Sequence, residues 1–444
     1  MGNSDTTKQT PRLPPGSRLP TLAQSAIYGL RPTEVVWRWR RKFGDVFTVK
    51  LLPTGPFAYV TDPEIARSIF AGDQSRLHAG ESNRMLEPVN GPSSIVVLDD
   101  AAHSRARRLL LPLFRPARIA AHADLIARVT RRQMRSWPQD RPFALAPRMQ
   151  DIALEVIVRT TLGDEDRIVA ELKSLLPRLL RANTWTWLPG LGRDLGPLSP
   201  AGRLRRLTAS IDAILHVEIA RRRDRSGTDG GSSLSYLIEA EVDGRRLDDA
   251  ELRDHLATLL LSGHETTSSS LAWAFERVLR HRHVVERIRA EGAADETPYL
   301  DATVKEVLRC RPAVMDTGRV LKGEQAVGGR MMPAGSSARV AISTIQQRPE
   351  LFADPEAFRP ERFLSGEVDP GDWMPFGGGA RRCLGAALAT LEMKVVLATV
   401  LSEAELVPAR RGDEAAAFRA PHLTLSPARG CRVILTGRPG PSQA

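Results

Sequence analysis

Cysteine, aromatic residues and long apolar runs are all scarce in this chain. It has three cysteines in 444 residues, and Phe, Trp and Tyr together make up 5%. So few cysteines cannot form a disulfide framework and are typical of a reducing compartment, which predicts a cytoplasmic protein. No stretch reaches the roughly 18 consecutive apolar residues of a membrane-spanning helix, so we expect no transmembrane anchor.

Positive charge is abundant instead. The chain has 63 Lys and Arg against 52 Asp and Glu, which gives a formal net charge of +11. Nucleic-acid-binding proteins share such an excess, but they also carry recognisable motifs. The sequence has no helix-turn-helix or zinc-finger pattern, so we expect no nucleic-acid partner. The charge then belongs to a generally basic surface or to a docking surface for an acidic protein.

The most informative segment is residues 376–385, FGGGARRCLG, which places Cys383 directly before an apolar helical pattern. No second Cys or His lies at zinc-ligand spacing, and no cysteine lies near enough in sequence for a local disulfide. The three glycines allow the backbone to approach a bound group closely. Beside Arg381 and Arg382 at a helix N-terminus, the thiol is expected to have a lowered pKa. These features indicate a single thiolate that faces a flat group.

This segment resembles the haem-binding loop of the cytochrome P450 family. The family's marked positions are held by Phe376, Gly379, Arg381, Cys383 and Gly385. The resemblance implies that Cys383 is the axial iron ligand of haem b (iron protoporphyrin IX). Four further segments occur in the family's order, so the resemblance covers nearly the whole chain.

The first of these segments contains Glu306 and Arg309, which share one helix face and can form an ion pair. Taken alone, the pair could be an ordinary surface contact. The setting of the pair resembles the family's core motif, in which the pair is structural. Another of the four segments is the Pro-rich segment 349–363, which resembles the family's meander before the haem loop. Arg362 of this segment is expected to join the ion pair.

The second segment is residues 259–267, LLLSGHETT, within a predicted buried helix. Asp248 and Glu251 form a capping box at the start of this helix, and its pattern continues to about Arg280. Glycine and a buried carboxylate are both unfavourable in such a helix.

Two interpretations of this unusual stretch remain open. The helix is kinked, with Thr266 bonded to a carbonyl one turn earlier, or the kink opens a pocket for dioxygen and water. Ser262 to Thr266 match the family's pattern of small residue, Gly, any residue, acid and Thr. The resemblance therefore implies that Glu265 and Thr266 deliver protons during catalysis. His264 is expected to be structural.

Three residues from the third segment and a later strand are candidate haem-propionate ligands by resemblance. His103 and Arg107 lie four residues apart on a predicted helix, and Arg319 lies in a predicted strand. With Arg381 they supply three guanidinium groups and one imidazole for two carboxylates.

Weaker patterns predict small sheets and a substrate pocket. Residues 47–60 read as a hairpin, 326–332 and 338–343 as strands, and 422–435 as a terminal hairpin. By position in the family, the pocket walls are expected from residues 80–97, 181–198 (with Trp185 and Trp187), 313–317 and 422–426.

The sequence therefore predicts a mainly α-helical cytochrome P450 fold with small β-sheets. It forms one large domain at residues 16–437, between a disordered tail at 1–15 and a second tail at 438–444. The resemblance implies a monooxygenase that inserts an oxygen atom from O2 into an apolar small molecule, by hydroxylation or epoxidation. Electrons are expected from a ferredoxin and its NAD(P)H-dependent reductase, with Arg107, Arg108, Arg382 and Lys394 as candidate docking residues.

Two alternatives stay open: a peroxide-driven peroxygenase of the same fold, and a non-catalytic protein that binds haem and senses or stores a gas. The substrate class is equally open among fatty acids, terpenoids, steroids and other secondary metabolites.

Overall fold

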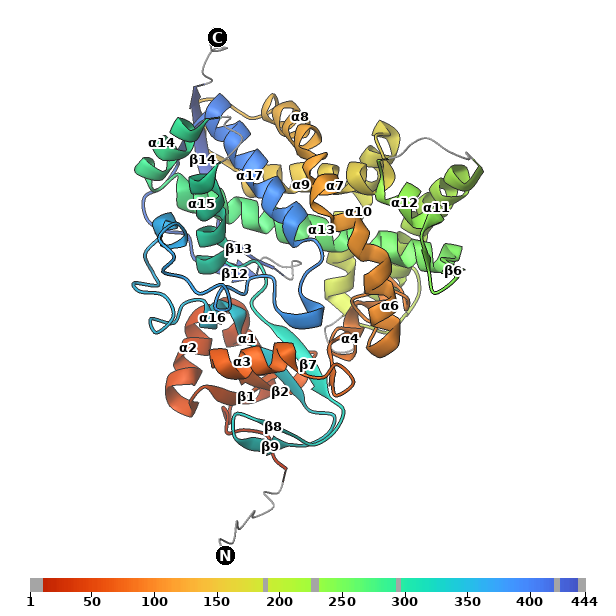
Figure 1. Cartoon of the computed structure of the whole chain (residues 1–444), viewed down its shortest axis with the longest axis vertical. Coiled ribbons are helices and arrows are strands. Elements are labelled where there is room, and N and C mark those ends of the chain that lie inside the picture. The colour runs from red at the N-terminus through yellow and green to blue at the C-terminus, as the bar shows by residue number, and fades with distance from the viewer. Residues whose placement is uncertain (1–10, 187–190, 225–230, 293–296, 419–423, 438–444) are drawn as a thin grey trace, which may run out of the picture.

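The computed structural model describes residues 11–186, 191–224, 231–292, 297–418 and 424–437. Helices make up most of these residues, and the largest sheet lies at one end of the molecule with α1 to α3 (Figure 1). The helices are α1 Thr21–Leu30, α2 Pro32–Phe43, α3 Pro63–Ala71, α4 Ala79–Ser82, α5 Glu87–Asn90, α6 Asp100–Leu110, α7 Pro116–Ala120, α8 Ala123–Met134, α9 Ala146–Leu162, α10 Asp166–Thr186, α11 Pro200–Asp224, α12 Ser233–Glu239, α13 Asp249–Val278, α14 Arg282–Glu291, α15 Pro298–Cys310, α16 Ile342–Ile345 and α17 Ala386–Glu403. The strands are β1 Val46–Leu51, β2 Gly55–Val60, β3 Leu77–His78, β4 Phe143–Ala144, β5 Glu241–Val242, β6 Arg245–Arg246, β7 Thr317–Leu321, β8 Gln325–Val327, β9 Arg330–Met332, β10 Ser337–Val340, β11 Glu405–Pro408, β12 Ala416–Phe418, β13 Leu425–Pro427 and β14 Arg432–Gly437.

The largest sheet has five strands in the order β1-β2-β10-β7-β3. The predicted hairpin is confirmed, because β1 and β2 pair antiparallel with Val46 opposite Val60. Strand β10 is parallel to β2 and antiparallel to β7. This arrangement places β7, which carries Arg319, between β10 and β3 inside the sheet.

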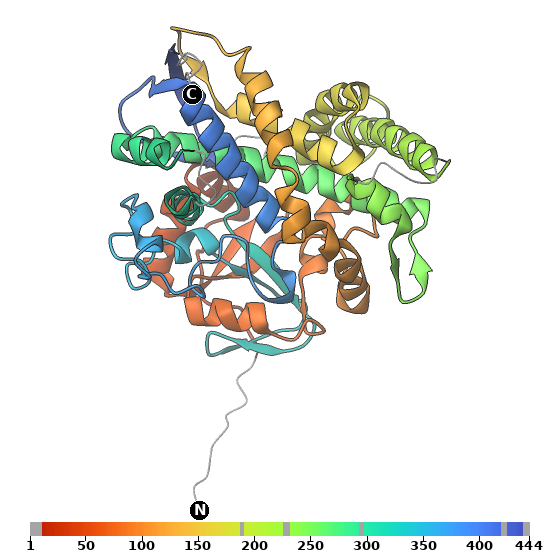
Figure 2. The ribbon, with the colours of Figure 1, turned by 45° about the horizontal axis from the view of Figure 1, so that its top comes forward.

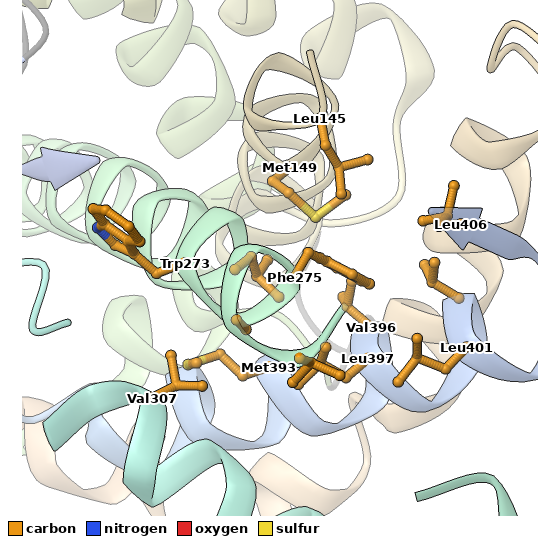
Figure 3. Close-up of a cluster of buried hydrophobic side chains, with 14 of the residues drawn as sticks. Leu145, Met149, Trp273, Phe275, Val307, Met393, Val396, Leu397, Leu401 and Leu406 are labelled. Carbon is orange, nitrogen blue, oxygen red and sulfur yellow. The ribbon is translucent and has the colours of Figure 1, made fainter. Parts of the chain in front are cut away.

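Helix α13 is the central element of the helical part. It begins at the predicted capping box, in which Asp248 and Glu251 each accept from the other's backbone N–H. Figure 2 shows α17 crossing α13. The C-terminal half of α13 packs with α9, α15 and α17 around Trp273 and Phe275, both fully buried (Figure 3). Its N-terminal half lies in a second apolar cluster, so α13 is buried along most of its length.

The predicted Glu306–Arg309 ion pair is confirmed and is completely buried. Arg309 Nε donates to Glu306 Oε2 at 2.7 Å, and both side chains have no exposed surface. Arg362 completes the network as predicted, since its Nε donates to Glu306 Oε1 at 3.1 Å. The two guanidinium groups also donate to the carbonyls of residues 353–357 and Gln346. The network therefore holds the segment before the haem loop against α15.

The predictions for residues 326–332 and 338–343 were wrong in detail. Residues 326–332 form two short strands, β8 and β9, because Gly328 and Gly329 both adopt positive φ and reverse the chain. Strand β10 ends at Val340, and the chain then turns into α16.

The predicted terminal hairpin was also wrong. Strands β13 and β14 do not pair with each other: β13 pairs with β12, and β14 pairs with β11 and β4. Pro427 ends β13 and has no N–H to continue a ladder. His422 and residue 423 lie outside the described residues.

Candidate active site

The loop that carries Cys383 is closed by backbone and aromatic contacts. The Cys383 N–H donates to the Phe376 carbonyl at 3.0 Å, and the Phe376 ring lies 5.9 Å from that of Trp373. Helix α17 begins at Ala386 with Gly385 as its N-cap. The loop therefore presents Cys383 just before the first turn of a long, partly buried helix.

The glycines of this loop serve packing against α3 as well as loop conformation. Gly377 and Gly379 both adopt positive φ, of 67° and 62°. A Cβ on Gly379 would overlap the carbonyl oxygen of Phe70 in α3, and a Cβ on Gly378 would lie 2.8 Å from the Phe70 ring. Close approach of the loop to α3 thus requires glycine at positions 378 and 379.

The expectation of a lowered pKa for Cys383 was wrong. Desolvation by the surrounding atoms raises the pKa of the thiol, even though Cys383 keeps exposed surface, while the Gly385 N–H, Arg382, Arg107 and the Ala386 N–H all act to lower it. The desolvation cost is larger than these favourable contributions. The same N–H groups and arginines would stabilise the thiolate form of Cys383.

The four predicted propionate ligands lie in one electropositive cluster. Burial, together with Arg381, Arg107 and Arg319, lowers the pKa of His103 to about 4. Burial and Arg381 lower the pKa of Arg319 to about 10, and burial lowers that of Arg381. Arg107 Nη1 donates to the Arg382 carbonyl at 3.0 Å, which attaches α6 to the haem loop.

Asp99 is a member of this cluster that the sequence analysis missed. Its carboxylate accepts from Arg381 and from the N–H groups of Gly80 and Glu81 at 2.8 Å. Asp99 is the N-cap residue of α6, although its side chain does not cap the helix. The sequence pattern therefore predicts a local role for Asp99, and it gives no sign of the contacts with distant residues.

The donor set fits a haem with two propionates. Arg319 is only 4% exposed, and within the described residues it forms no ion pair. The Arg381 Nε is buried without a hydrogen-bond partner there. Buried guanidinium groups of this kind require anionic partners, which two carboxylates supply. Cys383, on the same loop as Arg381, is the residue that would bind the iron of such a haem.

Helix α13 provides Thr266 and explains Gly263. The Thr266 hydroxyl donates to the Ser262 carbonyl at 2.8 Å, as the first interpretation predicted, while both side chains remain accessible. A Cβ on Gly263 would lie 2.6 Å from Ile157 of α9. The glycine therefore allows α9 and α13 to pack closely.

Glu265 lies on a different face of α13 from Thr266. Thr424 donates to Glu265 Oε1 through its hydroxyl at 3.1 Å and through its N–H at 3.3 Å. The Thr424 hydroxyl is also 2.8 Å from that of Ser269. Thr424 is the second residue that sequence reasoning did not single out, although it lies in the segment 422–426 predicted to close the site. His264 is fully buried, with Nδ1 2.8 Å from the Leu260 carbonyl.

Three of the predicted pocket walls are attached to α13 or to each other. Ser93 donates through its N–H to Asp254 at 2.8 Å, and the Ser94 hydroxyl is 2.6 Å from that of Thr258. The Leu425 N–H donates to the Ala313 carbonyl at 2.9 Å. In the fourth wall, Trp185 is 53% exposed and Trp187 lies outside the described residues.

Comparisons with known proteins agree with this geometry. Residues 12–431 match the sequence model of the family described as Cytochrome P450. Cytochrome P450 135B1 of Mycobacterium tuberculosis (strain ATCC 25618 / H37Rv) is 39% identical over 430 residues, which are 95% of this chain and 91% of that protein. Cytochrome P450 138 of the same strain is 33% identical over 431 residues, 96% and 97% of the two chains.

Two solved structures share the fold. Retinoic acid-bound cyanobacterial CYP120A1 superposes with a TM-score of 0.83 at 24% identity, over 96% of this chain and 99% of that chain. The cytochrome P450DA heme domain gives 0.82 at 20% identity, over 97% and 98%.

Fold and comparisons together define a haem-containing oxidoreductase of bacterial type. The chain belongs to the cytochrome P450 family of monooxygenases, whose cofactor is a haem with a thiolate ligand. Within the described ranges, every helix is too short or too polar to traverse a bilayer.

Proposed function

We propose that this chain inserts one atom of dioxygen into an apolar small molecule, with electrons from a ferredoxin and its NAD(P)H-dependent reductase. The observation that carries the proposal is that Cys383 lies on the same loop as Arg381, which belongs to the electropositive cluster of Arg107, Arg319, Arg381 and the neutral His103. We also propose that residues 16–437 form one domain and that the protein works in a reducing cytoplasm. Cys310, Cys383 and Cys431 are all free thiols, as is typical of that compartment.

Each side chain has a defined part in this proposal. Cys383 would hold the iron and the electropositive cluster would hold the propionates, while the bound haem would supply the redox chemistry of oxygen activation. Thr266 presents a hydroxyl on the accessible face of α13, where it can donate or accept a proton. Glu265, held by Thr424, is one residue away and supplies the carboxyl group of the same relay.

The absorption spectrum of the reduced protein with carbon monoxide tests the ligand. We expect a strongly red-shifted Soret band that Cys383→Ala abolishes and that Cys310→Ala, a matched change at a buried thiol, leaves in place. A band at the position typical of histidine-ligated haem in the wild-type chain would contradict the assignment.

Thr266→Ala distinguishes the monooxygenase from its alternatives. If Thr266 acts in proton delivery, the variant consumes NAD(P)H with less product per electron pair. Turnover with hydrogen peroxide alone, unaffected by reduced ferredoxin, would favour the peroxygenase instead. Oxygen binding without turnover in a panel of apolar compounds would favour the gas-binding protein.

A groove beside the haem loop is suited to the electron-transfer partner. It has a volume of about 650 Å³ and is lined by Phe70, Trp373, the three loop glycines, Lys305 and Arg382. Of the four candidate docking residues, Arg108 is paired with Asp243 and Lys394 with Asp301. Arg382 is exposed and forms no ion pair with any described residue, which makes it the strongest docking candidate.

A further inference from the structure

Helix α1 presents an apolar face to solvent. Leu22 is 70% exposed and Leu30 is 78% exposed, and Leu19 just before the helix is 45% exposed. No residue of α1 carries a charge. Exposed leucines gathered on one uncharged helix are uncommon on a protein surface that has no partner.

The orientation of this face is fixed by contacts on the opposite side of α1. The Tyr28 hydroxyl donates to Asp316 at 3.3 Å and lies 3.4 Å from the Tyr59 hydroxyl. Gln24, fully buried, donates to the Leu19 carbonyl at 2.7 Å and accepts from the Lys50 N–H at 3.1 Å. The leucines therefore point outward because the other face of the helix is attached to the sheet.

Uncompensated positive charge surrounds the apolar face. Helix α2 lies beside α1 at the sheet-bearing end of the molecule (Figure 1). Within the described residues, four basic side chains around it form no ion pair: Arg18, Arg38, Arg41 and Lys42. The other two basic residues here are neutralised, Arg31 by Glu34 and Arg40 by Asp45.

Beside the apolar face lies a groove of about 900 Å³, whose lining includes Leu19 but neither Leu22 nor Leu30. Its apolar lining includes Leu19, Ile27, Trp39 and Phe43, and its basic lining comprises Arg18, Arg38 and Lys42. The groove thus offers apolar contact and positive charge within one surface, which we call the α1 surface (α1, the basic residues named above and this groove).

We propose that the α1 surface binds an anionic lipid bilayer. Apolar side chains with flanking Lys and Arg suit the boundary between headgroups and acyl chains, where the cations meet lipid phosphates. A second copy of the chain fits less well, because a symmetric contact would bring two basic clusters together. The proposal concerns peripheral attachment and does not depend on the reaction proposed above.

Flotation of the haem-loaded full chain with vesicles tests this proposal. We expect binding to vesicles of equal parts phosphatidylglycerol and phosphatidylcholine at low salt, and little binding to pure phosphatidylcholine. Arg38→Gln with Lys42→Gln should weaken binding by about fivefold per charge removed. Leu22→Ser with Leu30→Ser should weaken binding by about tenfold or more.

Matched variants elsewhere on the surface serve as controls. Leu111 and Leu364 are 51% and 42% exposed and lie in separate segments of the chain, and Arg135 and Arg141 are exposed without an ion pair to a described residue. The same substitutions at these positions should leave vesicle binding unchanged. Equal loss in the controls, or no preference for the anionic vesicles, would overturn the proposal. The proposal would also be overturned if the chain did not bind vesicles but associated with itself, and if Leu22→Ser abolished that self-association.

Discussion

At the scale of single residues, two neighbouring glycines of the haem loop are constrained in different ways. Gly377 adopts positive φ in open space, whereas Gly379 adopts positive φ directly against the Phe70 carbonyl. A side chain at Gly377 therefore meets backbone strain alone, and a side chain at Gly379 meets strain and overlap.

This difference predicts unequal effects of alanine. Gly377→Ala should reduce the free energy of unfolding by about 1 kcal/mol. Gly379→Ala should reduce it by a further 1–3 kcal/mol, roughly, because the loop must move away from α3. Denaturant unfolding of both variants, with haem content measured in parallel, checks the prediction. Equal effects would show that α3 does not constrain the loop.

A second prediction at this scale concerns His255 of α13, which is 3% exposed. Burial lowers its pKa to about 4. Between pH 6.5 and 4 the unfolded chain binds a proton that the folded chain does not, so stability falls as the pH falls through this range. For this one residue the loss between pH 7 and pH 5 is about 2 kcal/mol.

Unfolding of the wild type and of His255→Leu at both pH values measures this loss. The difference in unfolding free energy between the two proteins should change by that amount. A difference that does not vary with pH would show that the pKa of His255 is the same in the folded and the unfolded chain. His103 has a similarly lowered pKa and contributes in the same direction.

At the scale of elements, the buried Glu306–Arg309–Arg362 network joins α15 to the segment that leads into the haem loop. One carboxylate compensates two guanidinium groups, and its Oε1 also accepts from the Arg359 N–H at 2.9 Å. Removing that carboxylate leaves two buried cations without a counter-charge.

Glu306→Gln should therefore destabilise the protein by about 3–5 kcal/mol and reduce haem incorporation. The control is Glu286→Gln, which breaks the exposed pair between Arg282 and Glu286 on α14. Such surface pairs contribute at most about 1 kcal/mol. Thermal unfolding and haem content of purified protein give the readout. A cost at position 306 no larger than at 286 would mean that the network is dispensable.

At the scale of the whole molecule, the net charge of +11 would attract an acidic redox partner. Arg382 lies at the rim of the groove beside the haem loop. Attraction over this distance raises the rate of encounter and is screened by salt.

Electron delivery from an acidic ferredoxin should therefore slow as ionic strength rises, and Arg382→Glu should raise the KM for ferredoxin with a smaller change in kcat. Arg135→Glu, the same change far from the loop, should have little effect. Steady-state kinetics with ferredoxin as the varied substrate decide this. If both variants behave alike, the partner does not dock at Arg382.

Local sequence determined several features of this protein by itself. The capping box at Asp248, the Glu306–Arg309 pair and the glycine loop before Cys383 each depend on residues within ten positions of one another, and the structure has all three. Each of these features depends on residues that lie close together in the sequence, so a short segment is enough to predict it.

Only the tertiary structure decided the contacts between distant segments. It placed Thr424 on Glu265, Asp99 on Arg381 and Ile157 against Gly263, pairs that are more than 100 residues apart. It also raised the pKa of Cys383, because desolvation of the thiol by surrounding atoms outweighs the helix N-terminus and the neighbouring arginines. Burial and long-range contact arise from the packing of many elements at once, so no single segment of sequence can specify them.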